Sequence, residues 1–435
     1  MVETATPPID VTDAVTRWLE ENWDTDLTVG EWWERIGESG WAFPAMPAEW
    51  CGKGMTREDG IRVQQAIARF GALSPPGGLG TLLAAPTIAV HGTTGQKERY
   101  IRHTVTGQRA WCQFFSEPGA GSDLAGLTTS AVRDGDEWVV NGQKVWTSGA
   151  QVADLGMLLA RTDPDVPKHQ GITYFVCDVH QPGIDIRPLK EMTGRSMFNE
   201  VFLTDVRVRH DDAVGGVNNG WAVANTTLAF ERAGLGAGAG GGAGMLASPG
   251  TVAGDLTRRA GDFVGRDPRA GGRGRASFGG GGNMLIELAK ANGKIDDPLI
   301  RQDLMRLHIL NEIARQTNQR AKALRATGKE IPGMGNMAKL AMSQILRLSR
   351  DVGLRIVGPY GTLHAYTDEG RARLDDATHL PLLNPVTEAA LAASGPSIYG
   401  GTDEIQHNIL GERVLGLPKE PNNDKITPFR DLPRN

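Results

Sequence analysis

Apolar residues recur at intervals of three to four positions along the first quarter of the chain. Trp32, Trp33 and Ile36 keep this spacing, and residues 62–70 resume it after a loop rich in proline and glycine. Residues so spaced share one face of a helix, which must then be buried. The pattern predicts an N-terminal α-helical domain over residues 1–110.

At about residue 111 the pattern changes to short apolar runs separated by turn residues. The runs at 155–160, 172–179 and 201–208 have the length and composition of strands. The Asn141-Gly142 dipeptide, which lies between two alternating stretches, is typical of a two-residue hairpin turn. We therefore expect a central β-domain over residues 111–212, built as an antiparallel sheet or barrel.

Helical spacing returns after residue 213, at 221–234, 301–326, 337–352 and 404–414. These segments predict a C-terminal helical bundle over residues 213–435, so the expected fold class is α+β: helical, then β, then helical. Residues 234–282 interrupt the bundle and are rich in glycine, alanine and arginine. Because such a composition buries little apolar area, we expect a flexible insertion there.

Composition narrows the class of protein. The 435 residues carry a net charge of −5 with acids and bases interspersed, which argues against nucleic-acid binding. No apolar run is long enough for a membrane span, and the N-terminus lacks the features of a signal peptide. Cys51, Cys112 and Cys177 have no metal-ligand spacing. These features predict a cytoplasmic protein without a metal centre.

The segment Glu-Pro-Gly-Ala-Gly-Ser-Asp is the strongest chemical signal. Gly119 and Gly121 lack a Cβ atom, so the backbone can approach an anionic group closely with its N–H donors exposed, and Ser122 adds a hydroxyl. Further along, Trp146 offers an aromatic face and Ser148 a polar edge. Together they indicate a site for a flavin nucleotide; the alternative for the glycine-rich segment alone is an ordinary turn.

Several separated motifs in the chain resemble those of a known family. They lie at residues 111–126 with 141–148, at 198–208, and at 398–406 with 411–416. In these motifs the chain resembles the acyl-CoA dehydrogenase family. The resemblance implies an FAD cofactor and oxidation of an acyl-CoA thioester to a 2,3-enoyl-CoA. It also implies that electrons pass to an electron-transfer flavoprotein, and that the subunits form a homo- or hetero-tetramer arranged as a dimer of dimers.

The resemblance also assigns residues to the cofactor and the substrate. FAD is expected between the β-domain and the C-terminal helices. Its implied contacts are Gln113, Phe115, Ser116, Gly121, Ser122, Trp146, Ser148, Thr402 and Glu404, with Gln302, Arg355 and Gly358 as partial matches to the positions that reach a neighbouring subunit's FAD. The implied substrate contacts are Ser122, Arg232, Tyr399 and Gly401.

The catalytic base requires a further comparison with the family. A carboxylate removes the α-proton of the thioester while a hydride leaves the β-carbon, and many members carry that glutamate at the position of Gly400. A second group of members places it on the helix after the β-domain, where this chain has Glu231-Arg232. The resemblance thus implies Glu231 as base in a dry site that raises its pKa, and the Gly400 N–H as a donor to the thioester oxygen. The alternative is a solvated Glu-Arg pair on a helix surface.

Departures from the family pattern leave several functions open. The family usually has an arginine and a Phe-Gly pair that reach the neighbouring subunit, but residues 289–294 lack that arginine, for which Arg301 or Lys294 could supply the charge. The Gln-x-x-Gly-Gly motif reads Arg-Ile-Val-Gly-Pro at 355–359. Besides a complete dehydrogenase, the chain fits a non-catalytic or half-site subunit of a hetero-oligomer, or an acyl-CoA oxidase. The acyl group can be bulky, 2-branched or a steroid side chain.

Overall fold

The computed structural model describes residues 10–234, 255–264, 282–380 and 382–433. The N-terminal helices are α1 (Val11–Asn22), α2 (Val29–Glu38), α3 (Arg57–Phe70), α4 (Ala85–His91) and α5 (Thr94–Val105). Thr28 and Thr93 begin α2 and α5 with capping boxes, which satisfy the free N–H groups of the first turn. Trp32 and Trp33 are fully buried, and their indole N–H groups donate to the backbone oxygens of Leu73 (2.7 Å) and Ser74 (2.9 Å). The apolar spacing therefore marks the buried faces of these helices.

Eight strands form one mixed sheet in the part of the chain that the structure describes. They are β1 (Trp111–Phe114), β2 (Ser130–Asp134), β3 (Glu137–Lys144), β4 (Leu155–Arg161), β5 (Ile172–Asp178), β6 (Ile184–Leu189), β7 (Phe198–Arg209) and β8 (Ala213–Val214). The order is β6-β7-β3-β2-β4-β5-β8, with β1 paired to β4. The α+β class is confirmed, but β4 pairs with β1 and β2 in parallel, so the sheet is not wholly antiparallel.

The expected hairpin turn at Asn141-Gly142 is wrong. Strand β3 runs through both residues with a bulge beside them, and the β2–β3 hairpin turns at Gly135, whose φ is +62°. Gly142 is needed for another reason, because a Cβ there would lie 2.4 Å from Thr129 Oγ1. The glycine permits a close approach between neighbouring strands, which a local sequence signal does not reveal.

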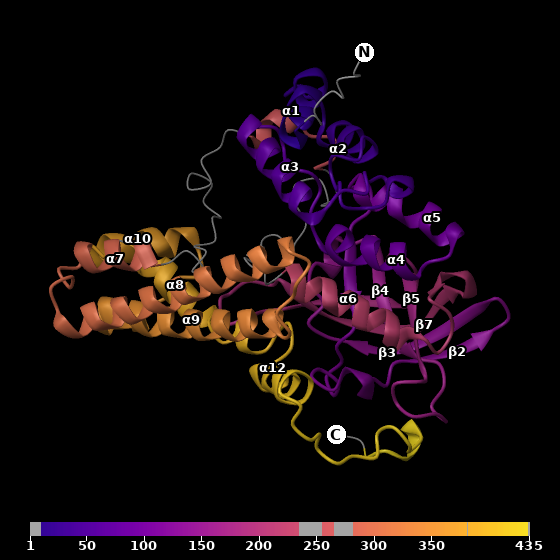
Figure 1. The fold of residues 1–435 in the computed structure, drawn as a ribbon. Helices are drawn as coiled ribbons and strands as arrows, with labels where there is room; N and C mark the ends of the chain where they lie inside the picture. Colours follow the sequence, from indigo (N-terminus) through magenta and orange to yellow (C-terminus); the bar gives the residue numbers. More distant parts are fainter. Residues whose placement is uncertain (1–9, 235–254, 265–281, 381, 434–435) are drawn as a thin grey trace.

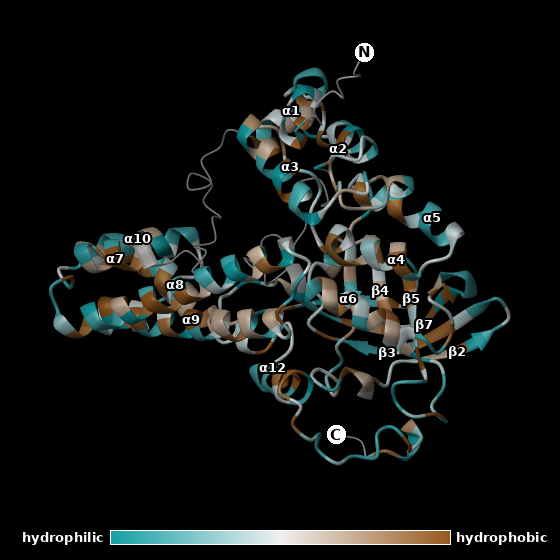
Figure 2. Cartoon of the chain, viewed as in Figure 1, coloured by the Kyte–Doolittle hydropathy of each residue, from teal (hydrophilic) through white to brown (hydrophobic). Residues whose placement is uncertain are grey.

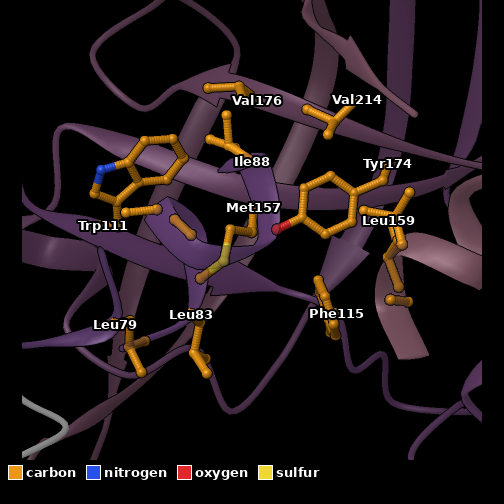
Figure 3. Packing of buried hydrophobic residues seen from close by; sticks show 14 of the residues in the cluster. Leu79, Leu83, Ile88, Trp111, Phe115, Met157, Leu159, Tyr174, Val176 and Val214 are labelled. Atoms are coloured by element: carbon orange, nitrogen blue, oxygen red, sulfur yellow. The ribbon is translucent and has the colours of Figure 1, made fainter. Parts of the chain in front are cut away.

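Helix α6 (Gly220–Gly234) packs with α4 over β4 and β5 (Figure 1). In Figure 3, Ile88 of α4 and Met157 of β4 lie between the rings of Trp111 and Tyr174 in the core that these elements share. Polar contacts also join the two helices, since Thr87 Oγ1 lies 3.0 Å from Thr227 Oγ1. These contacts hold the middle of α6 against α4 and the sheet.

The C-terminal region is helical. Its helices are α7 (Gly282–Ala291), α8 (Pro298–Ala326), α9 (Met334–Val357), α10 (Asp368–Thr378), α11 (Leu383–Ala392) and α12 (Asp403–Ile409), followed by a π-helical turn η11 (Leu410–Val414). Helices α7 to α10 project away from the sheet (Figure 1). Hydrophobic and hydrophilic residues alternate along α8 and α9 (Figure 2), as expected of amphipathic helices. Within the described ranges, no helix combines the length and apolarity needed to cross a bilayer.

Part of the predicted insertion is anchored. Residues 255–264 pack on the N-terminal helices, where Ala260 is buried and its N–H donates to Leu27 O (2.7 Å). The N–H of Val29 in turn donates to Arg258 O (2.8 Å). The remainder of the insertion predicted at 234–282 lies outside the described residues, apart from the ends of α6 and α7.

Candidate active site

The glycine-rich turn, residues 117–123, follows β1. Glu117 and Ala120 exchange both backbone hydrogen bonds (3.0 and 3.1 Å), so the turn is tight. Neither Gly119 nor Gly121 has the positive φ that would require glycine, and a Cβ on either would meet no atom within 4 Å. Packing within the chain therefore does not explain these glycines, whereas the open space beside them suits a ligand that approaches the backbone.

A buried ion pair fixes the start of the glycine-rich turn. The Glu117 carboxylate accepts hydrogen bonds from Lys144 Nζ (2.8 Å) and from the N–H groups of Thr128 (2.7 Å) and Thr129 (3.0 Å). Lys144 Nζ also donates to Phe115 O (3.1 Å). Burial alone raises the pKa of Glu117, but the Lys144 charge and the hydrogen bonds outweigh it and lower the pKa to about 2. Glu117 is thus ionised at neutral pH, while burial lowers the pKa of Lys144 and the Glu117 charge opposes that change.

The Trp-Thr-Ser segment lies beside the glycine-rich turn. The N–H of Val145 donates to Ser116 O (2.9 Å), and Thr147 pairs through its backbone with Asn199 of β7 (3.1 Å in both directions). Trp146 has a φ of +60°, which is uncommon for a bulky residue and persists only where the surroundings enforce it. Its side chain is 61% exposed, with its ring 5.8 Å from that of Phe198. The strained backbone thus presents an open aromatic face.

The other residues predicted to contact the cofactor near β1 differ in how far their side chains are exposed. Phe115 is buried, and its ring packs edge-on to Tyr174 in the core (Figure 3). Ser116 and Ser148 are partly buried, whereas Ser122 is exposed on the turn. The backbone of Phe115, rather than its ring, faces the buried lysine.

Glu231 lies near the end of α6, partly buried rather than solvated. Burial raises the pKa of the Glu231 carboxyl, while Arg232 and the side chain of Gln113 oppose the rise. The Gln113 amide nitrogen is buried and, among the described residues, has no hydrogen-bond partner of normal geometry. Burial lowers the pKa of Arg232, and Arg413 of η11 acts in the same direction. The end of α6 therefore lies close to both β1 and the C-terminal motif.

The loop before α12 presents a free backbone donor. Gly400 and Gly401 have φ values of +67° and +83°, which glycine adopts without strain. Gln406 Nε2 donates to the oxygens of Gly400 (2.8 Å) and Gly401 (3.3 Å), and Asn336 Nδ2 donates to Gln406 Oε1 (2.6 Å). Within the described residues, the Gly400 N–H has no hydrogen-bond acceptor, so it is available to a ligand.

A second buried ion pair holds this loop to α9. Lys339 Nζ lies 2.9 Å from Asp403 Oδ1, and both side chains are buried. Thr402 caps α12 by accepting from the Ile405 N–H (3.2 Å), while Glu404 is exposed and Tyr399 is 41% exposed. The cap and the ion pair leave the loop few alternative conformations.

Gln302, Arg355 and Gly358 are not brought to the glycine-rich turn. Arg355 forms an ion pair with Asp303, which joins α8 to α9, and Gly358 ends α9 with a φ of +60°. Within the described chain, no hydrogen bond or ion pair joins these residues to residues 113–123. Their place at a neighbouring subunit's cofactor stays a prediction.

Sequence reasoning missed several residues that shape the site. Lys144 was visible only as an inward position of an alternating strand, and its partner Glu117 only as the first residue of the motif. Gln406 was visible only as the last residue of the motif at 398–406, and Asn336 gave no signal, because their role depends on contact between α9 and α12.

Gly401→Ala is expected to distort the loop before α12. The new Cβ would lie 2.5 Å from Gln406 Nε2, at a φ that disfavours any other residue. We expect a loss of about 1–3 kcal/mol in the free energy of unfolding, measured by urea denaturation. Gly335→Ala on α9 is the control, since its Cβ would meet no atom within 4 Å. Equal stability of the two variants would contradict the strain expected from a side chain at residue 401.

Comparison with known proteins agrees with this architecture. Family models described as the N-terminal, middle and C-terminal domains of acyl-CoA dehydrogenase match residues 10–108, 112–206 and 286–415. Acyl-CoA dehydrogenase IpdE1 of Mycobacterium tuberculosis is 33% identical over 89% of this chain and 88% of its own length. Acyl-CoA dehydrogenase FadE34 of the same organism is 37% identical over 88% of this chain, and the match spans 46% of FadE34.

Solved structures give the same fold. The ChsE4-ChsE5 complex of Mycobacterium tuberculosis contains a chain with a TM-score of 0.66 and 26% identity, over 97% of this chain and all of that one. A steroid ACAD named Tcur3481-Tcur3483 has a TM-score of 0.67 and 24% identity, over 94% of this chain and 97% of that one. The match at 24% identity shows the fold alone.

Proposed function

This chain belongs to the acyl-CoA dehydrogenase family, and on that premise we propose that it catalyses FAD-dependent α,β-dehydrogenation of an acyl-CoA thioester with Glu231 as the base. The observation that carries the proposal is the carboxylate of Glu231. It is partly buried next to Gln113 of β1, and burial raises its pKa. Gly400, where many members have their glutamate, contributes no side chain.

The described residues fit FAD. The open space beside Gly119 and Gly121 admits a diphosphate, and the exposed ring of Trp146 suits a flat heterocycle. The side chain of Gln113 lies beside Glu231, and its buried amide nitrogen has no hydrogen-bond partner of normal geometry among the described residues. Ser122 and Ser148 would add hydroxyl donors, and Thr402 and Glu404 would approach from the C-terminal side. FAD, when bound, supplies the acceptor for the hydride that leaves the substrate.

The side chain of Glu231 would take up the α-proton. An ordinary carboxylate is a weak base for a C–H bond, so partial burial, which raises its pKa, brings it closer to the working pH. The Gly400 N–H, which has no acceptor in the described chain, would donate to the thioester oxygen and stabilise the charge that develops there. Arg232 would attract the anionic CoA, with Tyr399 and Gly401 beside the acyl group.

We propose a bulky acyl group, either 2-branched or a steroid side chain. Gly400 carries no side chain where many family members have a glutamate, and the structural neighbour Tcur3481-Tcur3483 is named as a steroid ACAD. A panel of straight, 2-methyl and steroid-side-chain CoA thioesters tests the proposal. Faster turnover of a straight medium chain than of either bulky class would overturn it.

A half-site subunit of a hetero-tetramer is the second candidate. The ChsE4-ChsE5 neighbour is a complex of different chains. In addition, Met305, Ile309 and Ile313 form an exposed apolar stripe on α8, which suits burial against another subunit. Gln302, Arg355 and Gly358 would then meet a partner's cofactor.

The chain expressed alone is expected to purify with bound FAD, and acyl-CoA should bleach the flavin absorbance. A colourless protein that takes up flavin only with a related chain would favour the half-site subunit. Turnover coupled to an electron-transfer flavoprotein under argon supports the dehydrogenase. Rapid oxygen consumption without an added acceptor would identify an oxidase instead.

A further inference from the structure

The last described residues of the chain pack on the β-domain (Figure 1). We call residues 418–433 the C-terminal strap; it follows η11 and lies against the loop of residues 162–171 between β4 and β5. The N–H of Phe429 donates to Val166 O (2.9 Å), and that of Arg430 donates to Pro164 O (3.0 Å). The family model ends its match at residue 415, so the strap lies beyond the part of the chain that the family defines.

Lys168 connects the strap to the glycine-rich turn. Its side chain is 9% exposed, and its Nζ lies 2.9 Å from Asp123 Oδ2 and 2.5 Å from Asp424 Oδ2. Asp123 is the last residue of the turn, and Asp424 belongs to the strap. Burial opposes the charge of Lys168, but the two carboxylates outweigh it and raise the lysine's pKa. One buried ammonium thus bridges two segments that are remote in sequence.

Arg161 makes a second connection. Its guanidinium donates to the oxygens of Ala125 (2.6 Å) and Leu127 (3.2 Å), directly after the glycine-rich turn. The ring of Phe429 covers the guanidinium, with its centroid 3.6 Å away. A cation over an aromatic face is stabilised, and exclusion of water strengthens the hydrogen bonds that it makes.

We propose that the C-terminal strap is part of the cofactor site and holds the glycine-rich turn, through Lys168 and Arg161, in the shape that receives a diphosphate. The inference rests on the proposed function for the identity of the ligand. The Glu117–Lys144 pair anchors the start of the turn, and these two cations anchor its end. Because a turn held at both ends loses little conformational entropy when the diphosphate binds, its affinity for the cofactor is higher.

The strap is not needed to complete the sheet. Strands β4 and β5 pair in full register from Leu155 to Arg161 without it. None of the hydrophobic clusters in the described chain includes a strap residue. We therefore expect strap variants to fold and to change the turn locally.

The test compares Asp424→Asn and Phe429→Ala with the control Lys425→Ala, an exposed strap residue. Hydrogen–deuterium exchange is measured on the full chain without added flavin, and FAD affinity is measured by fluorescence titration of the flavin-free protein. Exchange at residues 117–127 is expected to rise about tenfold in the two variants and to stay unchanged in β7, with FAD binding weakened about three- to tenfold. Asp424→Glu should restore both, because the carboxylate is retained.

Unchanged exchange at residues 117–127 in both variants would overturn the inference, as would wild-type FAD affinity in them. Faster exchange throughout the chain with a large fall in melting temperature would also overturn it, since the strap would then be a general stabiliser. Should the wild-type chain bind no FAD in any assembly, the proposed function fails, while the exchange of the turn still decides whether the strap holds it.

Discussion

Glu231→Gln is expected to lower turnover by about two to four orders of magnitude, the usual contribution of a general base. The amide keeps the size and shape of the side chain but cannot take up the α-proton. The measurement is the steady-state rate with an artificial electron acceptor, over the acyl-CoA panel described above. Glu98→Gln is the matched control, because Glu98 is an exposed glutamate on α5. Its rate should equal that of the wild type.

The raised pKa of Glu231 gives the same prediction a pH signature. Only the ionised carboxylate accepts a proton, so kcat/KM should fall as the pH drops through a pKa that lies above the ordinary value of 4.5. Because the folded state raises this pKa, ionised Glu231 destabilises the fold above that pH, and Glu231→Gln removes the cost. The variant should therefore melt at the wild-type temperature or above it. A marked fall in melting temperature would identify Glu231 as a structural residue instead.

Lys144→Met is expected to destabilise the protein by about 3–5 kcal/mol, the usual cost of leaving a buried partner unpaired. Glu117 would keep its hydrogen bonds to Thr128 and Thr129 but lose the ammonium 2.8 Å away, in a site where both side chains are almost inaccessible. Urea unfolding followed by circular dichroism measures the loss. Lys190→Met is the control, because Lys190 is exposed. The double variant Glu117→Gln/Lys144→Met should lose less than the sum of the single variants, since each single change leaves one uncompensated group.

The same ion pair predicts how stability depends on pH. Folding lowers the pKa of Glu117 from 4.5 to about 2, so its contribution is fully present above pH 4.5 and is lost as the pH falls toward 2. The loss amounts to about 3 kcal/mol over this window, at 1.36 kcal/mol per pH unit. Glu117→Gln should show a flatter stability profile below pH 4.5. Parallel profiles for the variant and the wild type would contradict the assignment.

The elements that sequence predicted well are those whose pattern reports burial directly. The apolar runs of β4, β5 and β7 and the helical spacing of α6, α8 and α9 lie where the sequence placed them, within a few residues at each end. The Asn141-Gly142 hairpin failed because the reason for Gly142 is a neighbour on another segment, Thr129. A local pattern carries no information about such contacts.

The site was predictable to the extent that its residues stand in short motifs. The glycine-rich turn and the Trp-Thr-Ser segment together indicate a flavin site in the sequence, and in the structure the hydrogen bond from Val145 to Ser116 joins them. The Lys144–Glu117 pair and the strap were not foreseen. Their partners are far apart in sequence, and only the folded sheet brings them into contact.

The most direct test of the account is rapid anaerobic mixing of the flavin-loaded protein with an acyl-CoA from the panel, followed by flavin absorbance. We predict that the wild type bleaches within a single turnover, and that Glu231→Gln binds the same thioester but keeps its oxidised spectrum. Bleaching of the Glu231→Gln protein at the wild-type rate would show that another group removes the proton, and the proposed mechanism would be wrong.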